Sequence, residues 1–227
     1  GPGYSQFEQE AINYANAKGA LVVAAAGNGG TSDPIYPSGY THVLTVAATD
    51  LTDHRSIWGI AASNFGPHVG VSSPGTSVYS TWKSPLYLEL SGTSVSTPIV
   101  SGTAALVKSL HPTWTPDQVA QQVRVTADPI DNINPGFSQN LGLGRVNAFR
   151  AVSENSSPGV QMISFTISDS IGGNNDKSLD PGDTARIVGQ FRNFLRPTSN
   201  ATAQLTTLDP FITITNANAL VSLGAIG

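Results

Sequence analysis

The sequence has no cysteine, and only 11% of its 227 residues are charged. Without cysteine it can form neither a disulfide framework nor a thiolate metal site. Its 11 Lys and Arg residues are outnumbered by 15 Asp and Glu, so it lacks the basic surface that nucleic-acid binding requires. No apolar run reaches the roughly 18 residues that cross a bilayer. We therefore predict neither nucleic acid nor a membrane as a partner.

The scarcity of charge also bears on where the protein works. A typical soluble protein has about 25% charged residues, so here Ser, Thr, Asn, Gln and Gly must cover most of the surface. This composition suits a secreted protein. The chain opens at Gly1 and its single methionine is Met162, so we expect it to be part of a longer protein.

The first third of the chain predicts an α/β fold. Ser5 and Glu8 form a capping-box pattern ahead of apolar residues at helical spacing, and Gly19 follows as a stop. The continuous apolar run that comes next, "ALVVAAAGN", is typical of a parallel strand buried on both faces. Two more strands are predicted at residues 42–49 and 68–75.

A Gly-Thr-Ser sequence precedes the next apolar segment, in "LSGTSVSTPIVSG" at residues 90–102. The helical pattern after Ser94 ends at His111, and Pro98 fits without a kink only in a helix's first turn. Ser94 is therefore predicted at the helix N-terminus, where unpaired N–H groups favour negative charge. A second capping box, at residues 115–118, begins another helix.

Both Ser94 and Asn28 have a structural and a functional interpretation. Serine caps helices routinely, and asparagine tolerates left-handed backbone angles in turns such as the Gly-rich one that follows the first strand. The carboxyl end of a strand is also where open α/β sheets place their sites. The pattern alone leaves both interpretations open.

From about residue 158 onward the hydrophobic period changes from helical to two. Ile163, Phe165 and Ile167 alternate with polar residues, and the alternation returns at Ile187 and at Ile212 and Ile214. We predict a β-sandwich accessory domain over residues 158–227, truncated because sandwiches commonly need about 100 residues. Residues 1–154 form the first predicted domain.

Three segments together resemble the C-terminal half of the catalytic domain of subtilisin-like serine peptidases: "VVAAAGNGG", "SSPGTSVYS" and "SGTSVSTPIVSGTAALVKSLHPTWTPDQV". The resemblance implies an α/β fold with a parallel sheet and helices on both faces, its N-terminal half absent. It implies that Ser94 is the nucleophile and Asn28 the side-chain donor of the oxyanion hole. It further implies that residues 25–27 (Ala25, Ala26 and Gly27) line the substrate pocket, opposite a segment that includes Gly1 and Gly3.

The family's aspartate and histidine segments have no counterpart here, and each of the four histidines, at positions 42, 54, 68 and 111, has a structural interpretation. A serine hydroxyl is a weak nucleophile without a histidine that accepts its proton. We therefore expect the parent protein to be an endopeptidase that cleaves polypeptides without a cofactor. This chain alone should be inactive without the missing N-terminal half. The alternative is a non-catalytic secreted scaffold or binding module.

A metal is not required by this chemistry, but the second domain leaves a structural calcium open. In "DSIGGNNDKSLDPGD", Asp176, Asp180 and Asp183 carry oxygen ligands of the kind that calcium prefers. Their spacing is not that of an EF-hand loop, so a plain turn is favoured and the ligands stay unknown.

Overall fold

The structure is a computed structural model that describes residues 3–83, 85–173, 180–207, 209–215 and 220–227. The chain forms two compact units, Gly1–Ser157 and Pro158–Gly227.

The first unit is built on a parallel sheet of three strands in the order β1-β2-β5. These strands are β1 (Val22–Ala25), β2 (Val43–Thr49) and β5 (Val71–Pro74). The register pairs Ala25 with Val46, and Val46 with Val71. All three strands were predicted from their apolar runs. Because the strands are parallel, their carboxyl ends, including the end of β1 that leads to Asn28, lie at one edge of the sheet.

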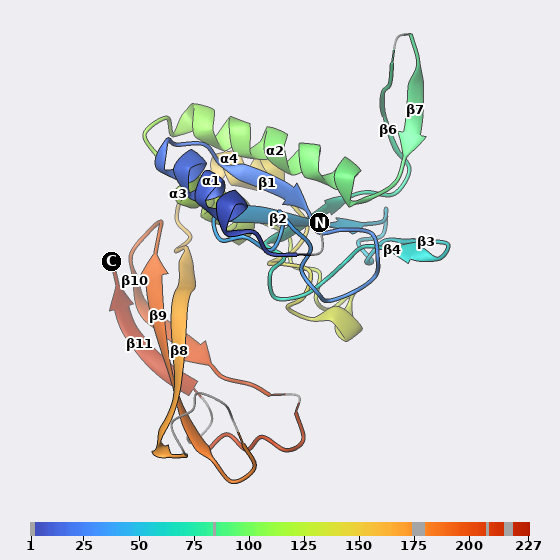
Figure 1. Cartoon of the computed structure of the whole chain (residues 1–227). Coiled ribbons are helices and arrows are strands. Elements are labelled where there is room, and N and C mark those ends of the chain that lie inside the picture. Colours follow the sequence, from blue (N-terminus) through green and yellow to red (C-terminus); the bar gives the residue numbers. More distant parts are fainter. Residues whose placement is uncertain (1–2, 84, 174–179, 208, 216–219) are drawn as a thin grey trace. The chain divides into compact units, whose positions relative to one another are not determined.

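Helices accompany the sheet (Figure 1). They are α1 (Gln6–Ala17), α2 (Thr93–Leu110), α3 (Pro116–Val125) and α4 (Ala148–Ser153), and a short 3-10 helix, η1, spans Pro135–Phe137. Helix α2 contacts all three strands as well as α3 and α4, while α1 contacts β1. The mixed α/β fold is confirmed.

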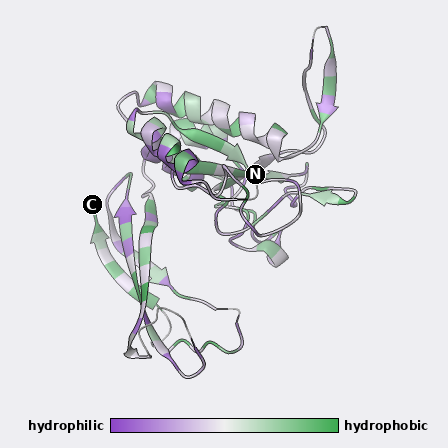
Figure 2. Ribbon diagram, in the orientation of Figure 1, coloured by the Kyte–Doolittle hydropathy of each residue, from purple (hydrophilic) through white to green (hydrophobic). Residues whose placement is uncertain are grey.

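The core of this unit has two parts because side chains alternate across the strands. On one side, Leu44, Val46 and Val71 pack with apolar residues of α2, α3 and α4. In the second part, Ala47 packs with Ala26, Val69, Ile130 and Leu141. Figure 2 shows hydrophobic colour concentrated along β1. Burial on both faces explains why the strand sequences read as continuous apolar runs.

Two hairpins in the first unit were not predicted. One pairs β3 (Ile57–Trp58) with β4 (Ala61–Ala62), and the other pairs β6 (Val78–Thr81) with β7 (Tyr87–Leu90). The second hairpin projects from the body of the unit (Figure 1). Most side chains of these two strands are exposed, because the hairpin is a ribbon of only two strands. Its sequence therefore lacks the pattern of alternating apolar and polar residues by which a half-buried strand is predicted.

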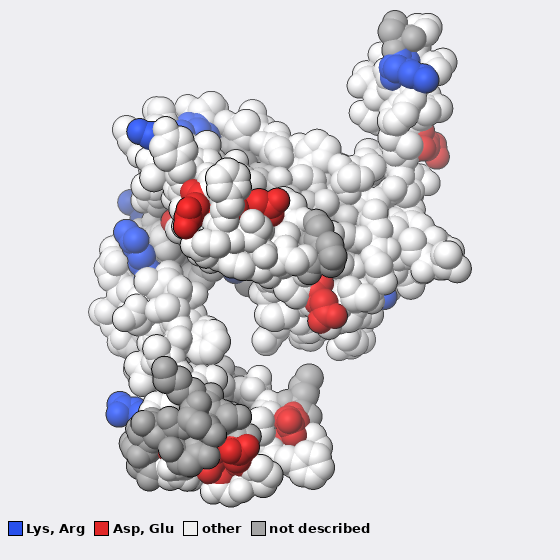
Figure 3. All heavy atoms as spheres, in the orientation of Figure 1, with Lys and Arg blue, Asp and Glu red and all other residues white. Residues whose placement is uncertain are grey.

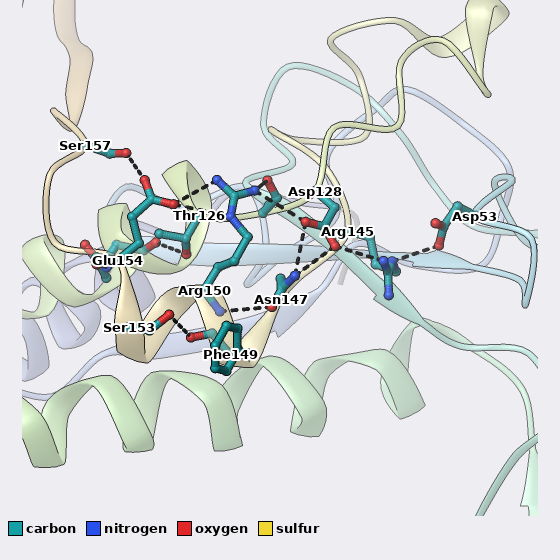
Figure 4. A network of polar contacts seen from close by, with 12 residues as sticks. Asp53, Thr126, Asp128, Arg145, Asn147, Phe149, Arg150, Ser153, Glu154 and Ser157 are labelled. Carbon is teal, nitrogen blue, oxygen red and sulfur yellow. Dashed lines mark hydrogen bonds and ion pairs between the residues drawn. The ribbon is translucent and has the colours of Figure 1, made fainter.

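A polar network ties α4 to the loops beside it (Figure 4). The carboxylate of Asp128 accepts hydrogen bonds from Arg145, Asn147 and Arg150. Arg145 also pairs with Asp53 at 2.9 Å, and Arg150 with Glu154 at 2.9 Å. Hydrogen bonds from Ser157 and Arg150 lower the pKa of Glu154. Charged side chains are otherwise sparse, as the mostly uncharged surface in Figure 3 shows.

The second unit consists of two antiparallel pairs. In one, β8 (Val160–Gly172) pairs with β9 (Thr184–Asn193), and in the other β10 (Thr198–Gln204) pairs with β11 (Leu220–Ile226). The strand predicted at Ile212 and Ile214 is wrong, because neither residue lies in a strand. Alternation over so few residues does not separate a strand from an extended loop. The β-sandwich stays a prediction.

Candidate functional site

Ser94 is the second residue of α2, which begins at Thr93 after the N-cap Gly92. Its side chain is exposed to solvent. The predicted position at the helix N-terminus is therefore found. Pro98, however, does not lie in the first turn as predicted: it is the sixth residue of α2 and lies inside the helix. Because proline has no N–H, the carbonyl of Ser94 lacks the donor that it would otherwise accept from at position 98.

Asn28 lies in the loop after β1, three residues beyond the strand end at Ala25, and its side chain is also exposed. The amide oxygen Oδ1 accepts hydrogen bonds from the Thr93 backbone N–H at 3.0 Å and from Thr93 Oγ1 at 2.9 Å. Thr93 Oγ1 accepts in turn from the N–H of Gly27 at 3.1 Å. Because a backbone N–H can only donate, Oδ1 must face Thr93, and Nδ2 is the atom left to face outward.

The two side chains converge at Gly92. A Cβ atom on Gly92 would lie 3.3 Å from Asn28 Nδ2 and 3.3 Å from Ser94 Oγ, so these two atoms are no further apart than twice that distance. Gly92 itself has φ 144°, a backbone angle that side-chain-bearing residues rarely adopt. Any side chain at this position would occupy the space that Nδ2 and Oγ share.

The backbone N–H of Ser94 is a further donor at this point. In the part of the chain that the structure describes, no acceptor contacts it, whereas the N–H groups of Val95 and Ser96 both bond to the Gly92 carbonyl. The first N–H groups of a helix carry the positive end of its dipole. Asn28 Nδ2 and the Ser94 N–H are thus two donors beside one hydroxyl, an arrangement that can bind an oxyanion.

A buried asparagine that the sequence analysis did not identify holds the Asn28 loop. Asn64 is 2% exposed, and its Oδ1 accepts hydrogen bonds from the N–H groups of Gly29 and Thr31 at 2.9 and 3.2 Å. Its own N–H donates to the Gly27 carbonyl at 2.8 Å. Asn64 is 36 positions from Asn28 and follows no local pattern, so no sequence signal marks it.

The other candidate residues are placed as follows. Gly27 and Ala26 are buried, and the side chain of Ala26 packs in the core, so only its backbone can face a substrate. Ala25 ends β1 and is half-buried. Gly3 is exposed with no atom near its Cβ position, and Gly1 lies outside the described residues. The described contacts do not join Gly3 to Asn28 or Ser94.

His42, His54 and His111 each contact another side chain. His42 Nδ1 lies 3.0 Å from Asp117, and His54 Nδ1 lies 2.9 Å from Thr52 Oγ1. His111 stacks on Trp114 at 3.7 Å, at the far end of α2 from Ser94. An 18-residue helix is about 27 Å long, so His111 cannot reach Ser94.

His68 is half-buried just before β5, at the opposite sheet edge from Asn28. Burial lowers its pKa. None of the described contacts of the four histidines involves Ser94.

Neither a larger metal-ligating cluster nor a membrane-spanning helix is present among the described residues. No group of three or more His, Cys, Asp or Glu side chains gathers there as a metal site. Asp176 lies outside the described residues, while Asp180 and Asp183 lie in one turn. No helix in the described ranges is long and apolar enough to span a membrane.

The comparisons with known proteins agree with this α/β unit. A model of the subtilase family, Peptidase_S8, matches residues 1–160. The chain belongs to this family, and the resemblance to subtilisin-like serine peptidases is confirmed.

Its relatives are proteases of similar sequence. Thermitase of Thermoactinomyces vulgaris is 40% identical over 144 residues, which are 63% of this chain and 48% of thermitase. Subtilisin BL of Lederbergia lenta is 37% identical over 147 residues, 65% of this chain and 51% of that protein. A solved protease structure from Pseudoalteromonas arctica PAMC 21717 matches with a TM-score of 0.60 and 30% identity, over 66% of this chain and 47% of that one. The chain spans about half the length of these relatives.

Proposed function

We propose that the protein to which this chain belongs is a secreted subtilisin-like serine endopeptidase in which Ser94 attacks the peptide carbonyl. Asn28 Nδ2 and the Ser94 backbone N–H then bind the oxyanion that develops on the carbonyl oxygen. The observation that carries this proposal is the convergence of Ser94 Oγ and Asn28 Nδ2 on the space beside Gly92.

The donors of this site are held before any substrate arrives. Thr93 fixes the orientation of the Asn28 amide, and Asn64 fixes the loop that presents it. Donors that need no reorganisation stabilise a transition-state charge more than mobile ones do. The substrate is an extended polypeptide that lies along the backbone of residues 25–27.

Proton transfer needs groups beyond those that contact Ser94 here. A histidine must accept the proton of the serine hydroxyl, and an aspartate must orient that histidine. We infer that both come from a separate N-terminal half of the peptidase domain. The 227-residue chain by itself then has an intact oxyanion site and an unactivated serine.

Active-site labelling tests this assignment. A serine-directed fluorophosphonate should label the full-length protein at Ser94, lose the label in Ser94→Ala, and leave the 227-residue chain unlabelled. Ser101→Ala is the matched control, because Ser101 is an exposed serine on the same helix. Robust labelling of the 227-residue chain alone would contradict the inference that its histidines do not activate Ser94.

The oxyanion role is tested separately by Asn28→Asp, which keeps an acceptor for Thr93 and removes the outward donor. In subtilisin, itself a member of this family, loss of the corresponding donor lowers kcat by about 10²–10³. We expect a similar loss in the full-length protein with little change in KM. An unchanged kcat would overturn the assignment of Asn28.

The alternative is a non-catalytic secreted scaffold, and the observation that favours it is that no described histidine contacts Ser94. A full-length protein that folds, yet neither hydrolyses peptides nor reacts with the fluorophosphonate, would establish this alternative.

A further inference from the structure

The second unit contains a buried carboxylate without a partner. Asp169, on β8, is 0% exposed, and neither of its carboxylate oxygens has a hydrogen-bond partner among the described residues. Burial of an ionised carboxylate costs several kcal/mol unless a counter-charge or hydrogen-bond donors compensate it. A group of this kind calls for a ligand that supplies the positive charge.

The strand pairing explains why the Asp169 side chain turns inward. Ser168 pairs with Arg186, but the next pair is Gly172 with Thr184, so β8 has more residues than β9 between these two pairs. Asp169 is the first residue of this irregularity. Extra residues in one strand bend it and redirect side chains, and such bulges are frequent beside functional sites.

A tight turn brings a second carboxylate to the same place. The N–H of Asp183 donates to the Asp180 carbonyl at 3.0 Å, and Gly182 has φ 98°, as a type II turn with Pro181 before it requires. Asp183 Oδ2 accepts from the Asp180 N–H at 3.1 Å. The turn therefore fixes Asp183, which is half-buried, directly before β9.

Gly173 lies between the two aspartates. A Cβ atom there would be 2.9 Å from Asp169 Cβ, 3.0 Å from the Asp169 carbonyl oxygen and 3.0 Å from Asp183 Cγ. Asp169, its main-chain carbonyl and the carboxyl group of Asp183 thus converge on Gly173, where any side chain would collide with them. Within the described ranges, no Lys, Arg or His forms an ion pair with either aspartate.

We propose that Asp169 and Asp183 bind a calcium ion at this end of the β8–β9 hairpin. Calcium takes six to eight oxygen ligands in irregular geometry and accepts carboxylates, main-chain carbonyls and water together, whereas magnesium demands near-ideal octahedral geometry. The ion neutralises both carboxylates and joins the irregular part of β8 to the turn that leads into β9. It is a structural ion that takes no part in the peptidase chemistry, so the proposal does not depend on the proposed function.

The test is made on the whole 227-residue chain, with calcium alone as the probe. Calorimetric titration should show a site with a dissociation constant of about 10⁻⁴–10⁻³ M, the range of extracellular calcium modules. In Asp169→Asn this site should be lost or weakened by more than about 10-fold, because one of its two charges is removed. Asp209→Asn, which replaces an aspartate of the same unit that lies in a different segment, is the matched control and should bind as the parent chain does.

Hydrogen exchange supplies a local readout that a general loss of folding would not imitate. Calcium should slow amide exchange in peptides from β8 and β9 and leave exchange in β2 unchanged. Asp183→Asn, in the exposed turn, keeps the acceptor for the Asp180 N–H and should abolish the calcium effect without unfolding the hairpin.

Without calcium, Asp169→Asn should not speed exchange in β8, since it removes an unpaired buried charge. Calcium-independent exchange in β8 and β9 of the parent chain, or calcium binding retained in both Asn variants, would overturn the proposal.

Discussion

The two units of the chain differ in what holds them together. Every buried hydrophobic side chain of the described structure lies between Ile12 and Ala151, in the first unit. In the second unit, the large apolar residues of β8, such as Ile163 and Phe165, are about half exposed, at 50% and 56%. Its buried polar residues are Asp169 and Asn193.

This difference follows from the two kinds of sheet. A parallel sheet is stable only when both faces are covered, so the first unit has to assemble a core from distant segments. A two-stranded hairpin forms locally but is marginally stable by itself. The second unit compensates with polar links such as Asn193, which accepts from the Gly159 N–H and donates to the Ile226 carbonyl.

The largest expected effect is a core truncation in the first unit, matched with the same change in the second. Leu141 is 0% exposed and Leu220 is 52% exposed. Leu141→Ala should lower the free energy of unfolding by about 2–5 kcal/mol, because it leaves a cavity. Leu220→Ala should change it by no more than about 0.5 kcal/mol.

Urea unfolding followed by tryptophan fluorescence measures the first unit alone, because all three tryptophans lie in it. Far-UV circular dichroism follows both units. Equal effects of the two leucine changes on the free energy of unfolding would show that the second unit also has a hydrophobic core. They would contradict the difference between the two units.

An intermediate effect is expected at the polar network of the first unit. Asp128→Ala removes the acceptor that Arg145, Asn147 and Arg150 share, and its carboxylate is only partly exposed, at 31%. Loss of hydrogen bonds to a charged group at such a site should cost about 1–3 kcal/mol. Tryptophan-monitored unfolding checks this value. Asp33→Asn, at an exposed loop residue of the same unit, is the control and should leave stability unchanged.

The smallest expected effect is a pH dependence confined to the first unit. Burial lowers the pKa of His68 below its ordinary value of 6.5, and its Nε2 is buried without a partner. As the pH falls below about 6.5, the unfolded chain binds a proton at His68 more readily than the folded chain does. The free energy of unfolding therefore decreases as the pH is lowered through this range. Above that pH both states are neutral and the effect vanishes.

In His68→Gln, the free energy of unfolding should decrease less between neutral and acid pH than in the parent chain. Near neutral pH, the substitution should have a smaller effect. Unfolding of both chains at about pH 7.5 and 5.5 gives the comparison. An unchanged slope in the variant would mean that another group titrates.

The sequence by itself determined the elements whose signals are local. The apolar runs gave the strands β1, β2 and β5, and Thr115 with Gln118 forms the reciprocal capping box that begins α3. The position of Asn28 beyond a strand end also followed from neighbouring residues, whereas Ser94 was placed at the helix N-terminus from a position of Pro98 that the structure contradicts. Helix caps and strand ends are readable because a few adjacent residues specify them.

Only the tertiary structure decided how these local pieces are oriented and supported. At α1, one half of the predicted box forms, because Ser5 Oγ accepts from the Glu8 N–H at 3.5 Å. The other half is bridged by Tyr40, whose hydroxyl accepts from the Ser5 N–H and donates to the Glu8 carboxylate. At the candidate site, Asn64 holds the loop of Asn28 from a distant part of the chain. Such contacts join residues that no sequence period connects, because they form only after the sheet has brought separate segments together.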